Sequence, residues 1–170
     1  MDNYPPHLAP DFNESGAVVT PFPAWWARVR DEFPNVPEEV AQYWAHEHWS
    51  HSPYRWLPSK EYIFERCDWN AANLFSVRSR WCDWATNNAG CIAHGEYLIE
   101  TLAHSGYKTS RYMLDNRDNH FSQNPNNIRD KDAPAEFLLI EGHRRFNMAL
   151  YLLTTTRFKP TTTVWMMRHI

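Results

Sequence analysis

Cysteine, glycine and long apolar runs are all scarce in this sequence. The chain of 170 residues holds three cysteines, at positions 67, 82 and 91, without a Cys-x-x-Cys spacing. Neither a disulfide framework nor a cysteine-rich zinc site is therefore expected. No apolar run approaches the ~20 residues that a membrane-spanning helix needs. The start of the chain is acidic and rich in proline, unlike a signal peptide. We therefore expect a soluble cytoplasmic protein without a membrane partner.

Positive charge is also in short supply. Lysine and arginine number 17 against 20 aspartates and glutamates, which gives a formal net charge of −3. Proteins that bind nucleic acid usually carry a concentrated basic face, so this balance argues against a nucleic-acid partner. Five glycines against twelve prolines indicate short, punctuated elements, and an aromatic content of 15% indicates a folded chain.

The first half of the chain is predicted to be a helical region behind an extended arm. Apolar side chains recur there at helical spacing, and a proline followed by two glutamates suits the first turn of the second helix. Residues 62–64 fit either a short strand or a helical turn. The expected elements are an arm over residues 1–21 and, within a helical region over residues 22–95, helices over residues 22–33, 37–49 and 68–86.

The second half, residues 96–170, is predicted to mix helices and strands. Gly106 suits a left-handed helix end, and β-branched and aromatic residues mark the strands. Strand–helix–strand order at the end of the chain predicts two parallel strands, adjacent or with one strand between them. The expected elements are a helix over residues 96–104, a strand over 107–114, a polar loop over 115–135, a strand over 136–140, a helix over 144–155 and a strand over 161–167. The fold class is therefore α+β.

The junction between the strand at 136–140 and the helix at 144–155 carries the most chemistry. It reads Glu141, Gly142, His143, Arg144 and Arg145. A helix N-terminus presents free N–H groups and partial positive charge, so it attracts phosphates. Glycine allows close backbone approach, and the two arginines suit bidentate contacts to phosphate. The histidine suits hydrogen bonding or acid–base chemistry, and the glutamate suits a water-mediated magnesium ion or the orientation of a nucleophile. The alternative interpretation is structural, with arginine salt bridges and a histidine that caps the helix.

Residues 98–167 resemble the N-terminal domain of the ParB/sulfiredoxin superfamily. Members carry a helix that ends in glycine, a strand, an apolar strand that runs into a G-x-x-R signature, a helix and a final strand. The corresponding segments here are LIETLAHSGYKTSRYML, FLLIEGHRRFNMALYLL and KPTTTVWMM, with an unusually long loop at 115–135. The resemblance implies a small mixed sheet with helices, and a nucleotide or other phosphate compound as ligand. It also implies Mg²⁺ together with a nucleoside triphosphate or diphosphate.

Two substitutions separate this chain from the best-known members of that family. Chromosome-partitioning members have glutamate where His143 stands, and sulfiredoxins have their catalytic cysteine where Gly142 stands. The sequence also ends at Ile170, before a helix-turn-helix region. We therefore expect neither a partitioning role nor repair of cysteine sulfinic acid. The GHRR variant is more similar to the solitary members, which include kinases, nucleotide hydrolases and phage- or defence-associated proteins.

The leading hypothesis is a domain that binds a nucleotide or phosphate compound at Glu141–Arg145, with phosphotransfer or hydrolysis as the reaction in question. Glu141 and His143 are its candidate catalytic residues. The expected phosphate-binding residues are Gly142, His143, Arg144 and Arg145, with Gly106, Tyr107 and Lys108 completing the cleft.

Two alternatives remain open. The first is a non-catalytic, phage- or defence-associated interaction protein that uses its tryptophan-rich helical half, with a homodimer or a protein partner contacting residues 22–60. The second is a ParB-like nuclease, which the weak basic balance disfavours. The tryptophan pairs Trp25/Trp26 and Trp81/Trp84 fall at core spacing, which favours packing over ligand binding.

No metal site is predicted. His46, His48 and His51 form a pattern that could indicate a metal site. Only residues three or four apart share a helix face, so solvated helix-end histidines are the preferred interpretation. In the long loop, Asp115, Asp118 and His120 could bind a divalent cation, but the composition favours a solvated surface loop. The family resemblance leaves a lid over a nucleotide as another option for this loop.

Overall fold

A computed structural model gives the fold of the chain. It describes residues 4–52, 57–78, 96–108, 111–120 and 136–170. The chain divides into two compact units, which are described separately. The first unit comprises residues 1–64 with 169–170, and the second comprises residues 65–168.

The first unit is built from short helical segments around buried tryptophans. The predicted helices at 22–33 and 37–49 are confirmed, although each is broken into shorter pieces. Proline at the start of α1 suits the first turn, where a missing N–H costs nothing. The segments are η1 (Pro6–Leu8), α1 (Phe22–Val29), η2 (Arg30–Glu32), α2 (Glu38–Val40), a π-helical turn η3 (Ala41–His46) and η4 (Ser59–Glu61).

Tryptophan side chains form the core of this unit. Trp25, Trp44 and Trp49 are buried, and the Trp25 indole donates a hydrogen bond of 2.8 Å to the Leu8 carbonyl. That bond ties the start of the chain to α1 and satisfies the polar end of a buried ring. Packing is therefore confirmed as the role of Trp25. Trp81 and Trp84 lie outside the described residues.

A five-stranded mixed sheet dominates the second unit. Its order is β1-β5-β3-β4-β2. β3 runs antiparallel to β4 and parallel to β5, and β2 runs parallel to β4. Asp68 bonds to Thr163 and Glu65 to Arg168, so β1 and β5 run in opposite directions. The strands are β1 (Tyr62–Asn70), β2 (Val77–Arg78), β3 (Arg111–Asp115), β4 (Phe137–Glu141) and β5 (Thr161–His169).

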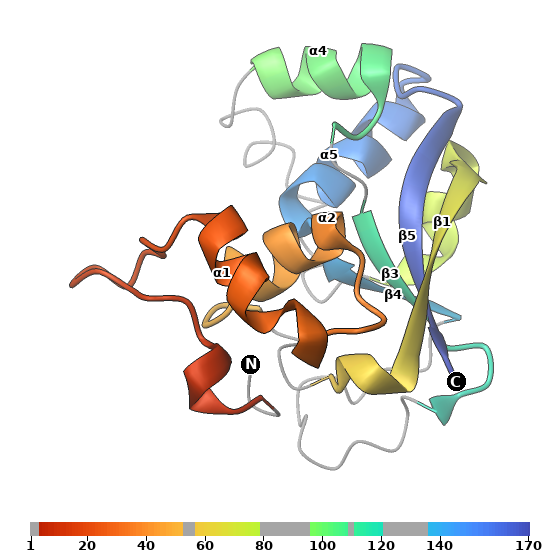
Figure 1. Cartoon of the computed structure of the whole chain (residues 1–170). Coiled ribbons are helices and arrows are strands. Elements are labelled where there is room, and N and C mark those ends of the chain that lie inside the picture. The colour runs from red at the N-terminus through yellow and green to blue at the C-terminus, as the bar shows by residue number, and fades with distance from the viewer. Residues whose placement is uncertain (1–3, 53–56, 79–95, 109–110, 121–135) are drawn as a thin grey trace. The chain divides into compact units, whose positions relative to one another are not determined.

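Two helices pack against each other beside this sheet. They are α4 (Glu96–Ser105) and α5 (His143–Thr154), which lie next to each other in Figure 1. The helix predictions at 96–104 and 144–155 are thus confirmed to within one residue at each end. The core between α5 and the strands is continuous and apolar. Among its buried members are Leu102, Met113, Leu139, Phe146, Met148, Ala149, Leu152, Val164 and Met166.

The predicted parallel pairing of the last two strands is wrong. β3 lies between β4 and β5, which is one of the two expected arrangements. However, β3 runs antiparallel to β4 and parallel to β5. β4 and β5 therefore run in opposite directions. The spacing of strand, helix and strand limits how far the chain travels, but it does not determine the direction in which the chain re-enters the sheet.

The predicted helix at 68–86 is also wrong where it can be compared. Residues 68–70 belong to β1, a 3-10 segment η5 (Ala71–Ser76) follows, and β2 begins at Val77. Asn70 ends the strand because its side chain accepts a hydrogen bond of 2.9 Å from the Ala72 N–H. The rest of the predicted helix lies outside the described residues. Residues 62–64, for which two structures were considered, form the start of a strand.

The α+β class is confirmed by this mixture of helices and a mixed sheet. Within the described ranges, no helix combines the length and the apolar character that a bilayer crossing requires.

Candidate functional site

The junction between β4 and α5 has an unusual backbone. Gly142 is the N-cap of α5 and has φ of +95°, a left-handed conformation that favours glycine. Its carbonyl accepts the Phe146 N–H at 2.9 Å, which opens the helix. Gly142 has no side chain with which to cap the helix, so the first-turn N–H groups lack the usual capping oxygen from this position.

A carboxylate already lies at this helix end. Glu141 Oε1 accepts a hydrogen bond of 2.8 Å from the Gly142 N–H. A negatively charged oxygen is favoured there because the helix N-terminus carries partial positive charge. The junction therefore already holds one anionic group, supplied by the chain itself.

A buried arginine lies behind Gly142. Arg111 is the first residue of β3 and is only 5% exposed. A Cβ added to Gly142 would overlap the Nη1 and Cδ atoms of Arg111. Glycine is thus required twice at position 142, once for its φ angle and once for the space that Arg111 occupies.

Tyr107 forms the next layer beneath Arg111. The guanidinium carbon of Arg111 lies 5.3 Å from the centre of the Tyr107 ring, and the ring of Phe158 lies 5.6 Å from Tyr107 on the hydrophobic core. Tyr107 follows Gly106, which ends α4 with φ of +68° as predicted for a left-handed helix end. The Tyr107 hydroxyl is shielded from solvent, and it makes no hydrogen bond with any residue that the structure describes.

Electrostatics at the junction follow from burial. Burial, and after it the charge of Arg145, lowers the pKa of Arg111, while Tyr107 and Glu141 act in the opposite direction. Burial also raises the pKa of Tyr107, so its hydroxyl keeps its proton at neutral pH. The guanidinium of Arg145 and the carboxylate of Glu141 therefore both act on the charge of Arg111.

Some of the predicted site residues contact Arg111 or Gly142, and others are exposed. Tyr107 and Gly142 both contact Arg111, and Glu141 bonds to Gly142. His143 is half-buried with its Nε2 shielded, and Arg145 is half-buried as well. Lys108 and Arg144 are exposed.

Arg144 is exposed at the start of α5, where a ligand can reach it. It lies in the first turn of α5 and forms no ion pair with another described residue. A guanidinium in this position suits bidentate contact with a phosphate that approaches the helix end.

Arg111 was not among the predicted site residues. Its signal in the sequence is weak: one charged residue opens the otherwise apolar run of Tyr112, Met113 and Leu114, all of which are buried. A charged side chain that stays buried is nearly always held by partners, but only the fold shows which ones.

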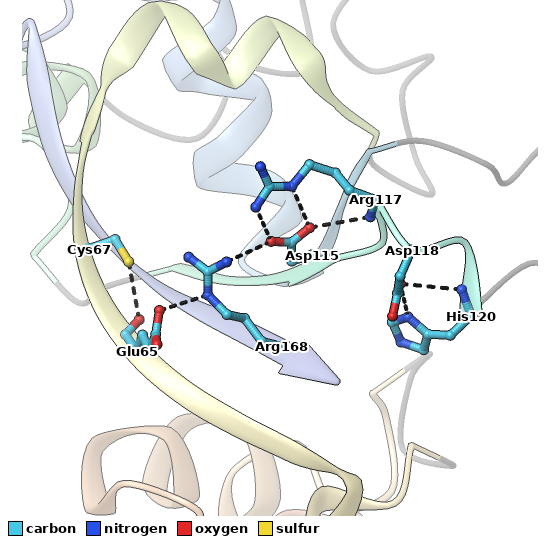
Figure 2. A network of polar contacts seen from close by, with 7 residues as sticks. All are labelled: Glu65, Cys67, Asp115, Arg117, Asp118, His120 and Arg168. Atoms are coloured by element: carbon cyan, nitrogen blue, oxygen red, sulfur yellow. Dashed lines mark hydrogen bonds and ion pairs between the residues drawn. The ribbon is translucent and has the colours of Figure 1, made fainter. Parts of the chain in front are cut away.

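A second polar cluster lies on β1, β3 and β5, and its charges alternate (Figure 2). Asp115 accepts hydrogen bonds from Arg117 Nε at 2.8 Å and Nη2 at 2.6 Å, and from Arg168 Nη1 at 3.1 Å. Arg168 Nε in turn donates to Glu65 at 2.7 Å. The hydrogen bonds from Arg117 lower the pKa of Asp115 and raise that of Arg117.

This network includes one of the residues considered as cation ligands, Asp115. The Asp115 carboxylate is occupied by two guanidinium groups, as Figure 2 shows, so its role is structural. Asp118 bonds to His120 Nδ1 at 2.5 Å. In the first unit, buried His46 bonds through Nε2 to the Thr20 carbonyl at 2.8 Å, and His51 bonds to Ser50. Within the described residues, His46, His48 and His51 do not form a three-ligand group.

Comparison with protein-family models, with curated proteins and with solved structures finds no match to the chain.

Proposed function

We propose that the chain contains a ParB/sulfiredoxin-like domain that binds a nucleotide or another phosphate compound at Glu141–Arg145. The observation that carries the proposal is the N-terminus of α5. There a left-handed glycine offers no side-chain cap, and exposed Arg144 lies in the same turn. Backbone N–H groups and the guanidinium of Arg144 thus belong to the first turn of one helix, and both kinds of group favour phosphate.

The same residues suit phosphotransfer or hydrolysis as the reaction. A phosphoryl transfer needs positive charge around the phosphate and a group that positions the nucleophile. Arg144 and the helix N-terminus supply the charge, and His143 in the first turn is the candidate acid or base. Glu141 is the carboxylate at the junction and fits a magnesium ion held through water, which would neutralise phosphate charge.

Substitution of Arg144 tests the proposed ligand. We expect ATP, ADP, CTP or GTP with magnesium to bind saturably to the wild-type chain in calorimetry, and Arg144→Ala to weaken that binding about tenfold, the range of one charge-assisted bidentate contact. Arg157→Ala is the matched control, since Arg157 is an exposed arginine just beyond the other end of α5. No binding by the wild type, or equal binding by Arg144→Ala, would contradict the proposal.

Substitution of Glu141 tests whether its carboxylate competes with the ligand. Because Glu141 Oε1 bonds to the Gly142 N–H, a phosphate must approach a carboxylate of like charge. We expect Glu141→Gln to tighten the binding of inorganic phosphate about fivefold in the absence of magnesium, as for removal of one repulsion near the surface. Phosphate titrations followed by ³¹P NMR measure this effect. Weaker phosphate binding by Glu141→Gln would show that the carboxylate does not compete.

A further inference from the structure

We propose that Arg111 makes the junction selective for a doubly charged phosphate group over a singly charged anion. This selectivity rests on the proposed function, and it adds the charge of the ligand and the residue that selects that charge.

Arg111 places a positive charge beside the start of α5. The guanidinium of Arg111 lies against Gly142, directly behind the N-cap of α5. At 5% exposure, Arg111 is largely removed from solvent. A buried charge acts on a nearby ligand with less screening than an exposed one such as that of Arg144.

A buried hydroxyl group, that of Tyr107, belongs to the side chain that stacks on Arg111. Tyr107 stacks on Arg111 at 5.3 Å, and the hydroxyl of Tyr107 is shielded from solvent without a hydrogen bond to any described residue. Buried hydroxyl groups nearly always have a partner. An oxygen of a bound ligand, or a water that bridges to it, would supply that partner. The hydroxyl of Tyr107 thus indicates a polar partner beside Arg111, and this observation does not depend on the helix end.

The Glu141 carboxylate competes with an anionic ligand for the junction. It is a single negative charge that already bonds to the Gly142 N–H. A singly charged ligand offers the junction no more charge than Glu141 does. A doubly charged group gains additional attraction from Arg111 and from Arg145, whose charge acts on Arg111. Removal of Arg111 should therefore reduce the advantage of the second charge.

Methyl phosphate and dimethyl phosphate provide the test. At pH 8 the first is doubly charged, since its second pKa is about 6, and the second carries one charge. We expect the wild-type chain to bind methyl phosphate at least about tenfold more tightly in calorimetry, and Arg111→Met, which keeps an unbranched apolar stem without the charge, to reduce that ratio to about twofold. The control Arg157→Met, at an exposed arginine beyond α5, should leave the ratio unchanged.

Tyr107→Phe provides a second variant, which keeps the ring that contacts Arg111 and Phe158. It removes the buried hydroxyl alone, and we expect methyl phosphate to bind about fivefold more weakly, as for loss of one hydrogen bond. If Arg111→Met does not fold, unchanged binding by Tyr107→Phe overturns the proposal.

The outcomes separate the two proposals. Nucleotide binding by the wild type with equal affinity for the two methyl esters, or an unchanged ratio in Arg111→Met, overturns the role of Arg111 alone. Absence of binding to every nucleotide and phosphate ester overturns the proposed function as well.

Discussion

Replacement of Gly142 by alanine is expected to lower the free energy of unfolding by about 3–4 kcal/mol. Two contributions add up to this loss: a non-glycine residue in a left-handed conformation costs roughly 1–2 kcal/mol, and an overpacked site costs roughly 1–3 kcal/mol. The φ angle of +95° supplies the first contribution. The second arises because the new methyl group would overlap the Nη1 and Cδ atoms of Arg111, a side chain that is itself buried. Urea unfolding followed by circular dichroism measures the loss. Loss of phosphate binding should accompany it, since α5 begins at this residue.

Two other glycines provide matched controls. Gly16 has φ of +79° with no atom within 4 Å of an added Cβ, so Gly16→Ala reports the backbone cost alone. Gly106 has φ of +68° and an added Cβ would lie 3.3 Å from Thr162 Oγ1, so Gly106→Ala should fall between the other two. An equal loss for all three variants would contradict the steric explanation.

A double-mutant cycle isolates the contact with Arg111. If the overlap is the cause, truncation in Arg111→Ala should relieve part of the cost of Gly142→Ala. The double variant should then be less destabilised than the sum of the single variants by about 1–2 kcal/mol, as for residues in contact. Additive losses would show that the two positions do not interact.

Replacement of Asp115 by alanine is expected to lower the free energy of unfolding by about 2 kcal/mol, the range for hydrogen bonds to a charged group. The Asp115 side chain is 9% exposed and joins Arg117 to Arg168. Its loss brings two guanidinium groups together without the carboxylate between them. Glu65→Gln is the control, because Glu65 is half-exposed and bonds to Arg168 alone, and it should cost less than about 1 kcal/mol. Equal losses in the two variants would contradict a central role for Asp115.

The contribution of Asp115 should also depend on pH. Its pKa is lowered in the folded protein by the hydrogen bonds from Arg117, so its stabilisation is fully present above the unfolded pKa of about 3.9. It is lost as pH falls from that value through the lower folded pKa. The stability gap between the wild type and Asp115→Ala should therefore stay constant from pH 7 to about 5 and narrow below about pH 4. A constant gap down to pH 2 would contradict this linkage.

Local patterns in the sequence were reliable where one element decides its own structure. The helix at 143–154 follows from an apolar run behind a glycine, and the end of α4 at Gly106 follows from the tolerance of glycine for positive φ. The candidate junction was recognisable for the same reason, because Glu141–Arg145 lie together in the chain. The helix expected at 68–86 failed because residues 68–70 belong to β1, where Asp68 bonds to Thr163 of β5, a distant partner that spacing cannot reveal.

The sequence by itself determined the α+β class, the helix that begins at the junction and the identity of the polar groups in its first turn. Only the tertiary structure decided the direction of β5, the chain of charges from Glu65 to Arg117 and the position of Arg111 against Gly142. The physical reason is the same for all three. Helices and turns depend on bonds between near neighbours, whereas strand pairing and buried charge depend on residues brought together across long stretches of chain.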